Sequence, residues 1–207
     1  MGAGPGRGEA PATQVVDRLL EDASNFEERF QPDYDAIEKI VDEVRARGLR
    51  VVLTSGSFDI LHEGHSMYLE AARDLGDFLI VGVDSDEKVR ERKGPGRPVV
   101  PEQERLRMLT HQRGVGLVTL KEPAHARWAL VKAVRPDILV ATEETYDDEE
   151  QRALGAYCGS VKILPRMATV STSARLRLMQ LDASKALADR IAQALPELID
   201  RLTNEVS

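Results

Sequence analysis

Several residue types are scarce in this 207-residue chain, and each scarcity excludes a class of protein. Cys158 is the single cysteine, so an internal disulfide is excluded and a Cys/His zinc cage is not expected. No run of about 18 apolar residues occurs, and the first residues lack the apolar core of a signal peptide. We therefore expect a cytoplasmic protein that does not enter a membrane.

Positive charge is also in short supply. The chain has 28 Lys and Arg residues against 35 Asp and Glu residues, which gives a net charge of -7. Proteins that coat nucleic acids usually present a basic face, so this balance argues against nucleic acid as a partner. A local basic cluster for a small phosphorylated ligand remains compatible with the composition.

The residue pattern divides the chain into four parts. Residues 1–13 are rich in Gly, Pro and Ala and are expected to form a disordered leader. Residues 14–48 show helical spacing and predict a helical extension, a pair of helices packed on the domain edge or on a second subunit. Residues 49–180 form the predicted main domain. Residues 181–207 form a helical tail, in which Pro196 should separate two helices.

The main domain shows short apolar runs separated by segments with helical spacing. Fully apolar runs of this length are typical of strands buried on both faces, and their alternation with helices predicts an α/β fold with a parallel five-stranded sheet. Such sheets bind ligands beyond the carboxyl ends of their strands. The predicted strands contain Val51–Leu53, Phe78–Val81, Val115–Leu120, Ile138–Val140 and Val161–Leu164.

Two histidines follow the first of these strands. His62 and His65 flank Gly64, and we expect Gly64 and His65 to begin the next helix. A helix start presents free N–H groups and partial positive charge, which together suit a phosphate group. No third metal ligand lies nearby at a suitable spacing, so phosphate binding is favoured over a metal site. The alternative is that the histidines only cap the helix.

The residues around this pair resemble a known signature. The stretch "GSFD", Gly56 to Asp59, followed by "HEGH", His62 to His65, is similar to the HxGH signature of the cytidylyltransferase-like nucleotidyltransferases. The likeness extends over Arg50 to Leu176. It looks closest to the heptose-1-phosphate adenylyltransferase branch, with the glycerol-3-phosphate cytidylyltransferase branch a near second.

Three further segments carry the same resemblance. In "RKGPGRPVVPEQER", Lys93 stands where relatives carry a lysine that approaches the α-phosphate, in a loop that could close over a nucleotide. In "PRMATVSTSARL", Arg166 precedes a Ser/Thr cluster that could cap a helix from Ser173. Here Thr169 replaces the glycine of many relatives. In "RPDILVATEETYDDEE", the acidic residue expected after the fourth strand is present, but the preceding glycine is not.

The resemblance implies a Rossmann-like domain and assigns roles to particular residues. The catalytic residues would be His62, His65 and Lys93. The nucleotide would contact Ser55, Gly56, Ser57, Phe58, Asp59, Gly64, Arg166, Ser171, Thr172 and Ser173. The acceptor or the nucleotide would contact Arg97, Thr142, Glu143 and Glu144.

These roles predict nucleotidyl transfer from a nucleoside triphosphate to a phosphorylated small molecule. ATP and a sugar 1-phosphate such as heptose 1-phosphate are favoured. Glycerol 3-phosphate with CTP, or a riboflavin phosphate with ATP, are alternatives within the enzyme class. Mg²⁺ is the expected cofactor, bound by phosphate oxygens and water without a protein metal site. The resemblance also implies a homodimer. A nucleotide-binding regulator without the reaction, or an interaction protein acting through its terminal helices, are the alternatives outside the enzyme class.

Overall fold

The computed structural model of the chain describes residues 12–20, 25–143, 145–165, 167, 179–181, 184–188 and 190–195. Two units, Met1–Met167 and Ala168–Ser207, each have their own internal contacts. In the second unit, residues 179–181, 184–188 and 190–195 are helical. The helix predicted from Ser173 and the break predicted at Pro196 lie outside the described residues.

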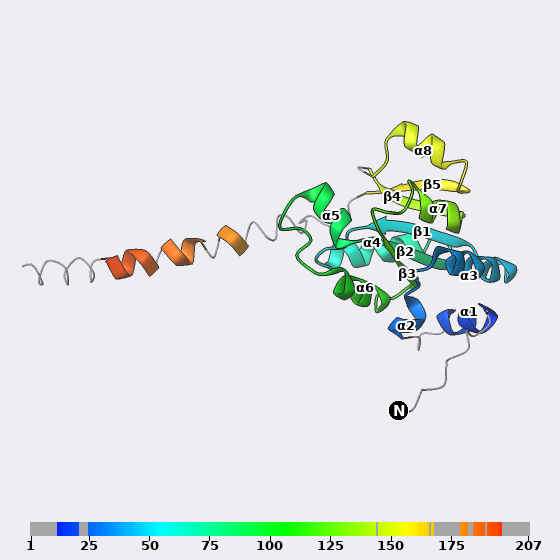
Figure 1. Cartoon of the computed structure of the whole chain (residues 1–207), viewed down its shortest axis with the longest axis horizontal. Helices are drawn as coiled ribbons and strands as arrows, with labels where there is room; N and C mark the ends of the chain where they lie inside the picture. The colour runs from blue at the N-terminus through cyan, green and yellow to red at the C-terminus, as the bar shows by residue number, and fades with distance from the viewer. Residues whose placement is uncertain are drawn as a thin grey trace, which may run out of the picture. The chain divides into compact units, whose positions relative to one another are not determined.

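The first unit alternates strands and helices, as the sequence pattern predicts (Figure 1). Its strands are β1 (Val51–Gly56), β2 (Phe78–Asp84), β3 (Val115–Lys121), β4 (Ile138–Thr142) and β5 (Ser160–Leu164). Its helices are α1 (Ala12–Leu20), α2 (Phe26–Arg29), α3 (Tyr34–Ala46), α4 (Glu63–Arg73), α5 (Asp86–Lys93), α6 (Glu102–Thr110), α7 (Ala129–Val134) and α8 (Asp148–Leu154).

The five strands form one parallel sheet in the order β3-β2-β1-β4-β5. The chain runs outward from β1 to β3 and then returns to place β4 on the other side of β1. The connection that follows β1 leads to β2 on one side, and the connection that follows β4 leads to β5 on the other side. The two connections diverge, so a crevice opens at the carboxyl ends of β1 and β4. The α/β class and the parallel Rossmann-like sheet are both confirmed.

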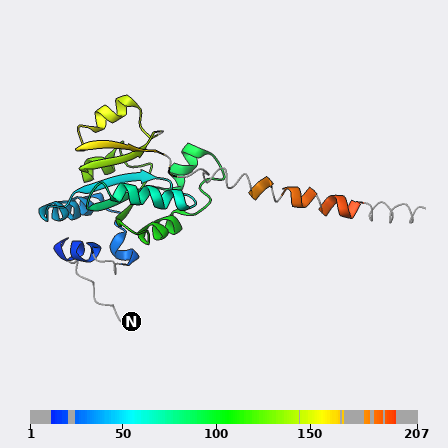
Figure 2. The same cartoon turned by 180° about the vertical axis from the view of Figure 1, so that it is seen from behind.

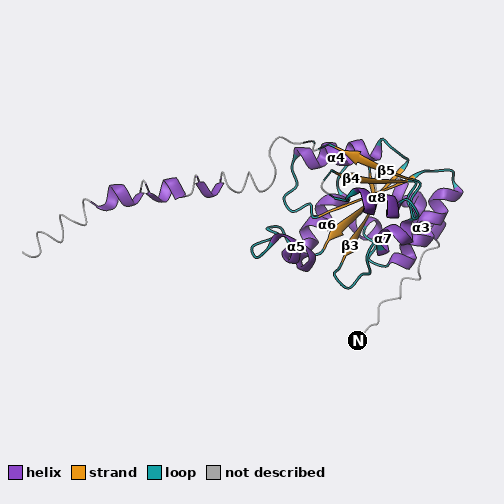
Figure 3. Ribbon diagram, turned by 90° about the horizontal axis from the view of Figure 1, so that it is seen from above, coloured by secondary structure: helices purple, strands orange, loops and turns teal. Residues whose placement is uncertain are grey.

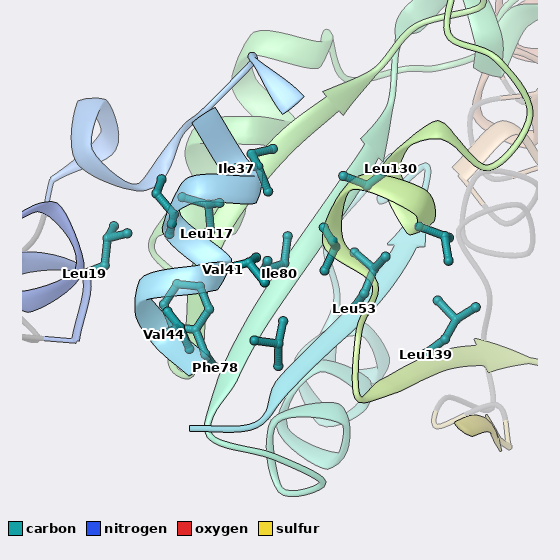
Figure 4. Close-up of a cluster of buried hydrophobic side chains, with 14 of the residues drawn as sticks. Leu19, Ile37, Val41, Val44, Leu53, Phe78, Ile80, Leu117, Leu130 and Leu139 are labelled. Atoms are coloured by element: carbon teal, nitrogen blue, oxygen red, sulfur yellow. The ribbon is translucent and has the colours of Figure 1, made fainter. Parts of the chain in front are cut away.

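Helices cover both faces of the sheet, which explains why the strands are apolar throughout. One face packs Leu53, Ile80 and Leu117 against α1, α3 and α7 (Figure 4). The other packs Val52 and Val81 against α4 and α6. Figures 2 and 3 show the same layers from behind and from above.

The helical extension shares the core of the sheet. Helix α3 begins after Asp33, whose side chain accepts a hydrogen bond from the Asp35 N–H, and buries Ile37, Ile40, Val41 and Val44. Its apolar stripe lies in the same cluster as β1 and β2. The prediction of a pair of helices was incomplete, because the described residues include the short helix α2 as well. None of the described helices combines the length and the apolar character that crossing a bilayer requires.

Candidate active site

The loop that leaves β1 carries the two histidines to the crevice between β1 and β4. His62 is the residue before α4, with an extended backbone (φ -147°, ψ 171°), and its side chain makes no capping hydrogen bond. The helix begins at Glu63, one residue earlier than predicted. The imidazole of His62 is therefore not engaged in capping this helix, and the His62 carbonyl accepts the N–H of His65 at 2.8 Å.

The two imidazoles lie on the same side of this helix start. Their ring centroids are 4.0 Å apart with an interplanar angle of 22°, so the rings stack. The ring of Phe58 meets His65 edge-on at 5.5 Å and 61°. The prediction that the two histidines point to the same side is confirmed by this contact.

Phe58 occupies an unusual backbone conformation that fixes this arrangement. Its φ of 46° lies in the left-handed region, which is rare for a bulky residue. Its ring covers Gly56, where an added Cβ would lie 3.1 Å from Cε2 of Phe58. Glycine at this position lets the Phe58 ring lie beneath His65.

Burial controls the charge of His65. Removal from solvent, followed by the positive charges of His62 and Lys93, lowers the pKa of His65 from 6.5 to about 4. The backbone of Ile60 and the carboxylate of Asp59 act in the opposite direction. His65 is consequently neutral at neutral pH and carries one N–H, which the backbone of Ile60 accepts.

Lys93 reaches the same loop from the next helix. It is the last residue of α5, not part of a loop as predicted, and Gly94 follows it with a φ of 88°. Its ammonium group donates a hydrogen bond to Ser57 Oγ at 2.8 Å. Burial, then the charge of Arg92, lower the pKa of Lys93. The lysine is thus directed at the loop after β1, which the resemblance predicts to bind phosphate.

Asp59 ties this loop to the segment after α5. Its carboxylate accepts hydrogen bonds from Arg97 at 2.7 Å and from the N–H groups of Val99 and Val100 at 2.7 and 3.0 Å. Burial alone would raise the pKa of Asp59, but the hydrogen bonds from Val100 and Arg97 hold it below its usual value. Asp59 and Arg97 thus bind each other, and their contacts with substrates stay predictions.

Arg105 is the residue that sequence reasoning missed. This residue of α6 is only 1% exposed, although its side chain is charged. It donates hydrogen bonds to the carbonyls of Ser57, Val100 and Asp84 and to the carboxylate of Asp86. A lone arginine in a helix is usually solvent-exposed, so only its place within the family likeness could have indicated this role.

The loop after β4 is built differently. The Thr145 hydroxyl accepts a hydrogen bond from the Thr142 N–H at 3.1 Å and lies 2.9 Å from Thr142 Oγ1. Glu143 is exposed. Two threonine hydroxyls, together with the Thr145 N–H on the Thr142 carbonyl at 2.9 Å, close this turn.

The remaining predicted residues divide into two groups. Ser55 lies half-buried near the end of β1, and Gly64 is buried in the first turn of α4. The structure therefore gathers most of the predicted residues at one edge of the sheet. Outside the described residues lie Glu144, Arg166, Ser171, Thr172 and Ser173.

The acidic side chains of this edge do not suit a protein-bound metal. Asp59 is held by Arg97 and two backbone N–H groups, and Asp84 is held by Lys121 and Arg92. Across the described part of the chain, no group of three or more His, Cys, Asp or Glu side chains could hold a metal ion. Instead, the edge offers N–H groups, imidazoles and a lysine, which together can hold a polyphosphate and stabilise added negative charge.

Comparisons with known proteins identify the family of the segment that carries this site. The family model described as cytidylyltransferase-like matches residues 53–184, which include both histidines and Lys93. The bifunctional protein HldE of a Nitratiruptor species is 45% identical over 113 residues, which are 55% of this chain and 24% of that protein. The bifunctional protein HldE of Alkalilimnicola ehrlichii is 43% identical over 144 residues, which are 68% of this chain and 30% of that protein.

The chain thus spans less than a third of the length of these two relatives, 24% and 30%. Among solved structures, the lipopolysaccharide core biosynthesis protein from Thermoplasma volcanium GSS1 is 30% identical with a TM-score of 0.49, over 57% of this chain and 97% of that chain. Because the family model matches more than half of the sequence, the protein belongs to the cytidylyltransferase-like family of nucleotidyltransferases.

Proposed function

We propose that this protein transfers a nucleoside monophosphate from ATP to a sugar 1-phosphate, such as heptose 1-phosphate, and releases pyrophosphate. One observation carries the reaction type: two stacked imidazoles and Lys93 meet at the start of α4, in the crevice where the sheet changes direction. Positive groups and N–H donors placed where charge develops are what phosphoryl chemistry requires.

In the proposed step, a phosphate oxygen of the acceptor attacks the α-phosphorus of the triphosphate. The new bond joins that oxygen to phosphorus, and the bond to the β-phosphate oxygen breaks, so pyrophosphate leaves with the electron pair. The attacking phosphate is already ionised near neutral pH, because the second pKa of a phosphate monoester is about 6. No general base is therefore needed for this attack.

The residues of the chain would act on the charge that develops. His65 would redirect its single N–H from the backbone of Ile60 to an oxygen of the α-phosphate, and His62 would donate to the same phosphate beside it. Lys93 would transfer its hydrogen bond from Ser57 to the same phosphate. Arg166 and the segment Ser171 to Ser173 are proposed for the β- and γ-phosphates. Mg²⁺, when bound to the triphosphate oxygens, would supply further charge neutralisation.

The choice of substrates rests on the relatives. Two relatives that match this chain at 43% and 45% identity carry the name bifunctional protein HldE, and the sequence resembles the heptose-1-phosphate adenylyltransferase branch. The acidic Glu143 follows β4 at the crevice, where relatives place an acidic residue. A homodimer also stays a prediction, which sedimentation would test.

A matrix of nucleoside triphosphates against phosphorylated acceptors, read by pyrophosphate release, tests the proposal. We expect the strongest signal with ATP and a sugar 1-phosphate, and none in the absence of acceptor. Pyrophosphate release with CTP and glycerol 3-phosphate would contradict the proposed substrate pair but support the same type of reaction. Nucleotide binding without pyrophosphate release for any acceptor would contradict the proposed function and indicate a regulator.

A further inference from the structure

A second group of charged side chains lies at the same edge of the sheet, beside the site described above. β2 ends at Asp84 and β3 ends at Lys121, and these two residues are partners in the sheet register. Lys121 Nζ lies 3.2 Å from Asp84 Oδ1. Asp84 is only 2% exposed, and the partly exposed Lys121 covers its carboxylate.

The Lys121 side chain crosses the sheet toward β1. A Cβ added at Gly82 would lie 2.5 Å from Leu130 Cδ2, 2.8 Å from Lys121 Cδ and 2.8 Å from Ser55 Oγ, so these three side chains share the space over this glycine. Gly82 is the residue of β2 that pairs with Ser55. The absence of a side chain at Gly82 therefore lets the lysine stem lie over β2, close to the residue that precedes the phosphate-binding loop.

Positive charge exceeds negative charge around Asp84. Arg92 approaches its carboxylate at 3.0 Å, in addition to Lys121. Burial alone would raise the pKa of Asp84, but the charges of Lys121 and Arg92, with a smaller effect of Lys88, hold it below its usual value. One buried carboxylate is thus paired with two cations, Lys121 and Arg92, and the surplus positive charge of this group can attract an anion.

Three further cations at this edge have partners outside the group around Asp84. Arg97 binds Asp59, Arg105 binds Asp86 and three carbonyls, and Lys93 contacts the phosphate-binding loop. The proposed reaction brings a second anion, the acceptor phosphate, close to a triphosphate. That approach requires a cation besides Lys93, and Lys121 is half-buried beside Ser55 where it can supply one.

We propose that Lys121, oriented by Asp84 across Gly82, binds the phosphate of the acceptor and determines which acceptors are accepted. This inference rests on the proposed function. Asp84 acts as a positioning residue, because its carboxylate holds the ammonium group at the edge. The remaining acidic neighbour in sequence, Glu122, is exposed and faces Tyr34, whose pKa its charge helps to raise.

Steady-state kinetics of Lys121→Met test the proposal, because methionine keeps the length of the stem and removes the charge. We expect the acceptor KM to rise about tenfold or more, which corresponds to the loss of one charged contact, while the triphosphate KM changes less than about twofold. Inorganic phosphate should inhibit the wild type in competition with the acceptor. In Lys121→Met this inhibition should weaken by about the same factor as the acceptor affinity. Lys121→Arg should retain much of the acceptor affinity.

Lys132→Met is the matched control, since this exposed lysine of α7 lies over the Tyr157 ring. It should change neither KM. An unchanged acceptor KM in Lys121→Met, or an equal rise in both KM values, would overturn the inference while leaving the proposed function intact. If Lys121→Met fails to fold, as thermal melting would show, Lys121→Gln is judged by the same two KM values. Absence of pyrophosphate release from the wild type with every substrate pair would reject the proposed function and this inference with it.

Discussion

The loops after β1 and β4 leave neighbouring strands at the same edge of the sheet, yet they are held in opposite ways. The β1 loop is fixed from outside: Arg97 binds Asp59 and Arg105 binds the Ser57 carbonyl. The β4 loop closes on itself through the hydroxyls of Thr142 and Thr145. The first loop therefore depends on residues 38 and 48 positions away in the sequence, whereas the second is local.

This difference indicates that the two loops have different roles. The β1 loop leads to the histidines that the proposed reaction uses, and long-range contacts from two arginines hold its geometry. The β4 loop has no charged anchor among the contacts described for Thr142 and Thr145. A self-contained turn can change in sequence without disturbing the rest of the site, which suits a role in substrate selection.

The largest expected effect lies in the histidine pair that the β1 loop leads to, at the start of α4. His65→Ala should lower kcat about 100- to 1,000-fold, because one preorganised donor to the transition state is lost. The melting temperature should change little, since the imidazole lies at the edge of the fold. His111→Ala, at the end of α6, is the control and should keep full activity. Near-normal kcat in His65→Ala would reject the role of the β1 loop.

Arg105→Met should break the external support of that loop. It leaves three carbonyls and the Asp86 carboxylate without their buried donor, so we expect the free energy of unfolding to fall by about 3 kcal/mol or more. Urea unfolding measures this loss. Arg107→Met, on the same helix but exposed over the Phe26 ring, should cost far less. Equal losses in the two variants would show that Arg105 gives the loop no special support.

Lys93→Ala should separate chemistry from stability. We expect kcat to fall about tenfold or more, equivalent to about 1.4 kcal/mol of barrier, with little change in urea unfolding. The lysine is exposed at the end of α5, and its described hydrogen bond is to Ser57. Arg90→Ala, one turn earlier on α5, is the control. A loss of stability as large as that of Arg105→Met would assign Lys93 to the scaffold instead.

The pH dependence of stability provides a smaller test. The pKa of His65 is about 4 in the folded protein and 6.5 in its ordinary state, so the unfolded chain binds more protons between these values. His65 should therefore make the free energy of unfolding fall as pH drops from about 6.5 to about 4. Its surroundings include His62, Lys93 and Asp59, which titrate or carry charge themselves. Urea unfolding of His65→Gln over this range should fall less steeply than that of the wild type, and parallel curves would contradict the lowered pKa.

The smallest effect is expected in the β4 loop. Thr145→Val removes the hydroxyl that joins Thr142, and should cost about 0.5–1.5 kcal/mol of stability because the turn is exposed. Its kcat should change less than about twofold, unlike that of His65→Ala. Thr145→Ser keeps the hydroxyl and should restore the stability. A large loss of kcat in Thr145→Val would show that both loops carry chemistry.

The sheet and the histidine site could be predicted because their signals are local. Strands buried on both faces, such as β2, consist of apolar residues in sequence, and all five apolar runs are strands in the structure. His62 and His65 are close in sequence and follow a strand, so a helix start was sufficient to bring them together.

Residues whose role depends on distant partners could not be predicted in the same way. Arg105 and Asp84 look like ordinary charged residues until the fold brings Ser57 and Lys121 to them. Lys93 was expected in a loop because glycines and a proline follow it, but the acidic first turn and basic last turn of α5 extend the helix to Lys93 itself. The amphipathic spacing of α3 predicted a helix without indicating that it completes the core of the sheet.

The buried guanidinium of α6 has a consequence for genetics. A screen for inactive variants in living cells would recover changes at Arg105 as readily as changes at His65. A change at Arg105 would remove the hydrogen bonds that connect three chain segments, whereas a change at His65 would remove the proposed donor to the substrate, and either would abolish product. Only the amount of intact protein in each mutant strain would tell the two kinds of lesion apart.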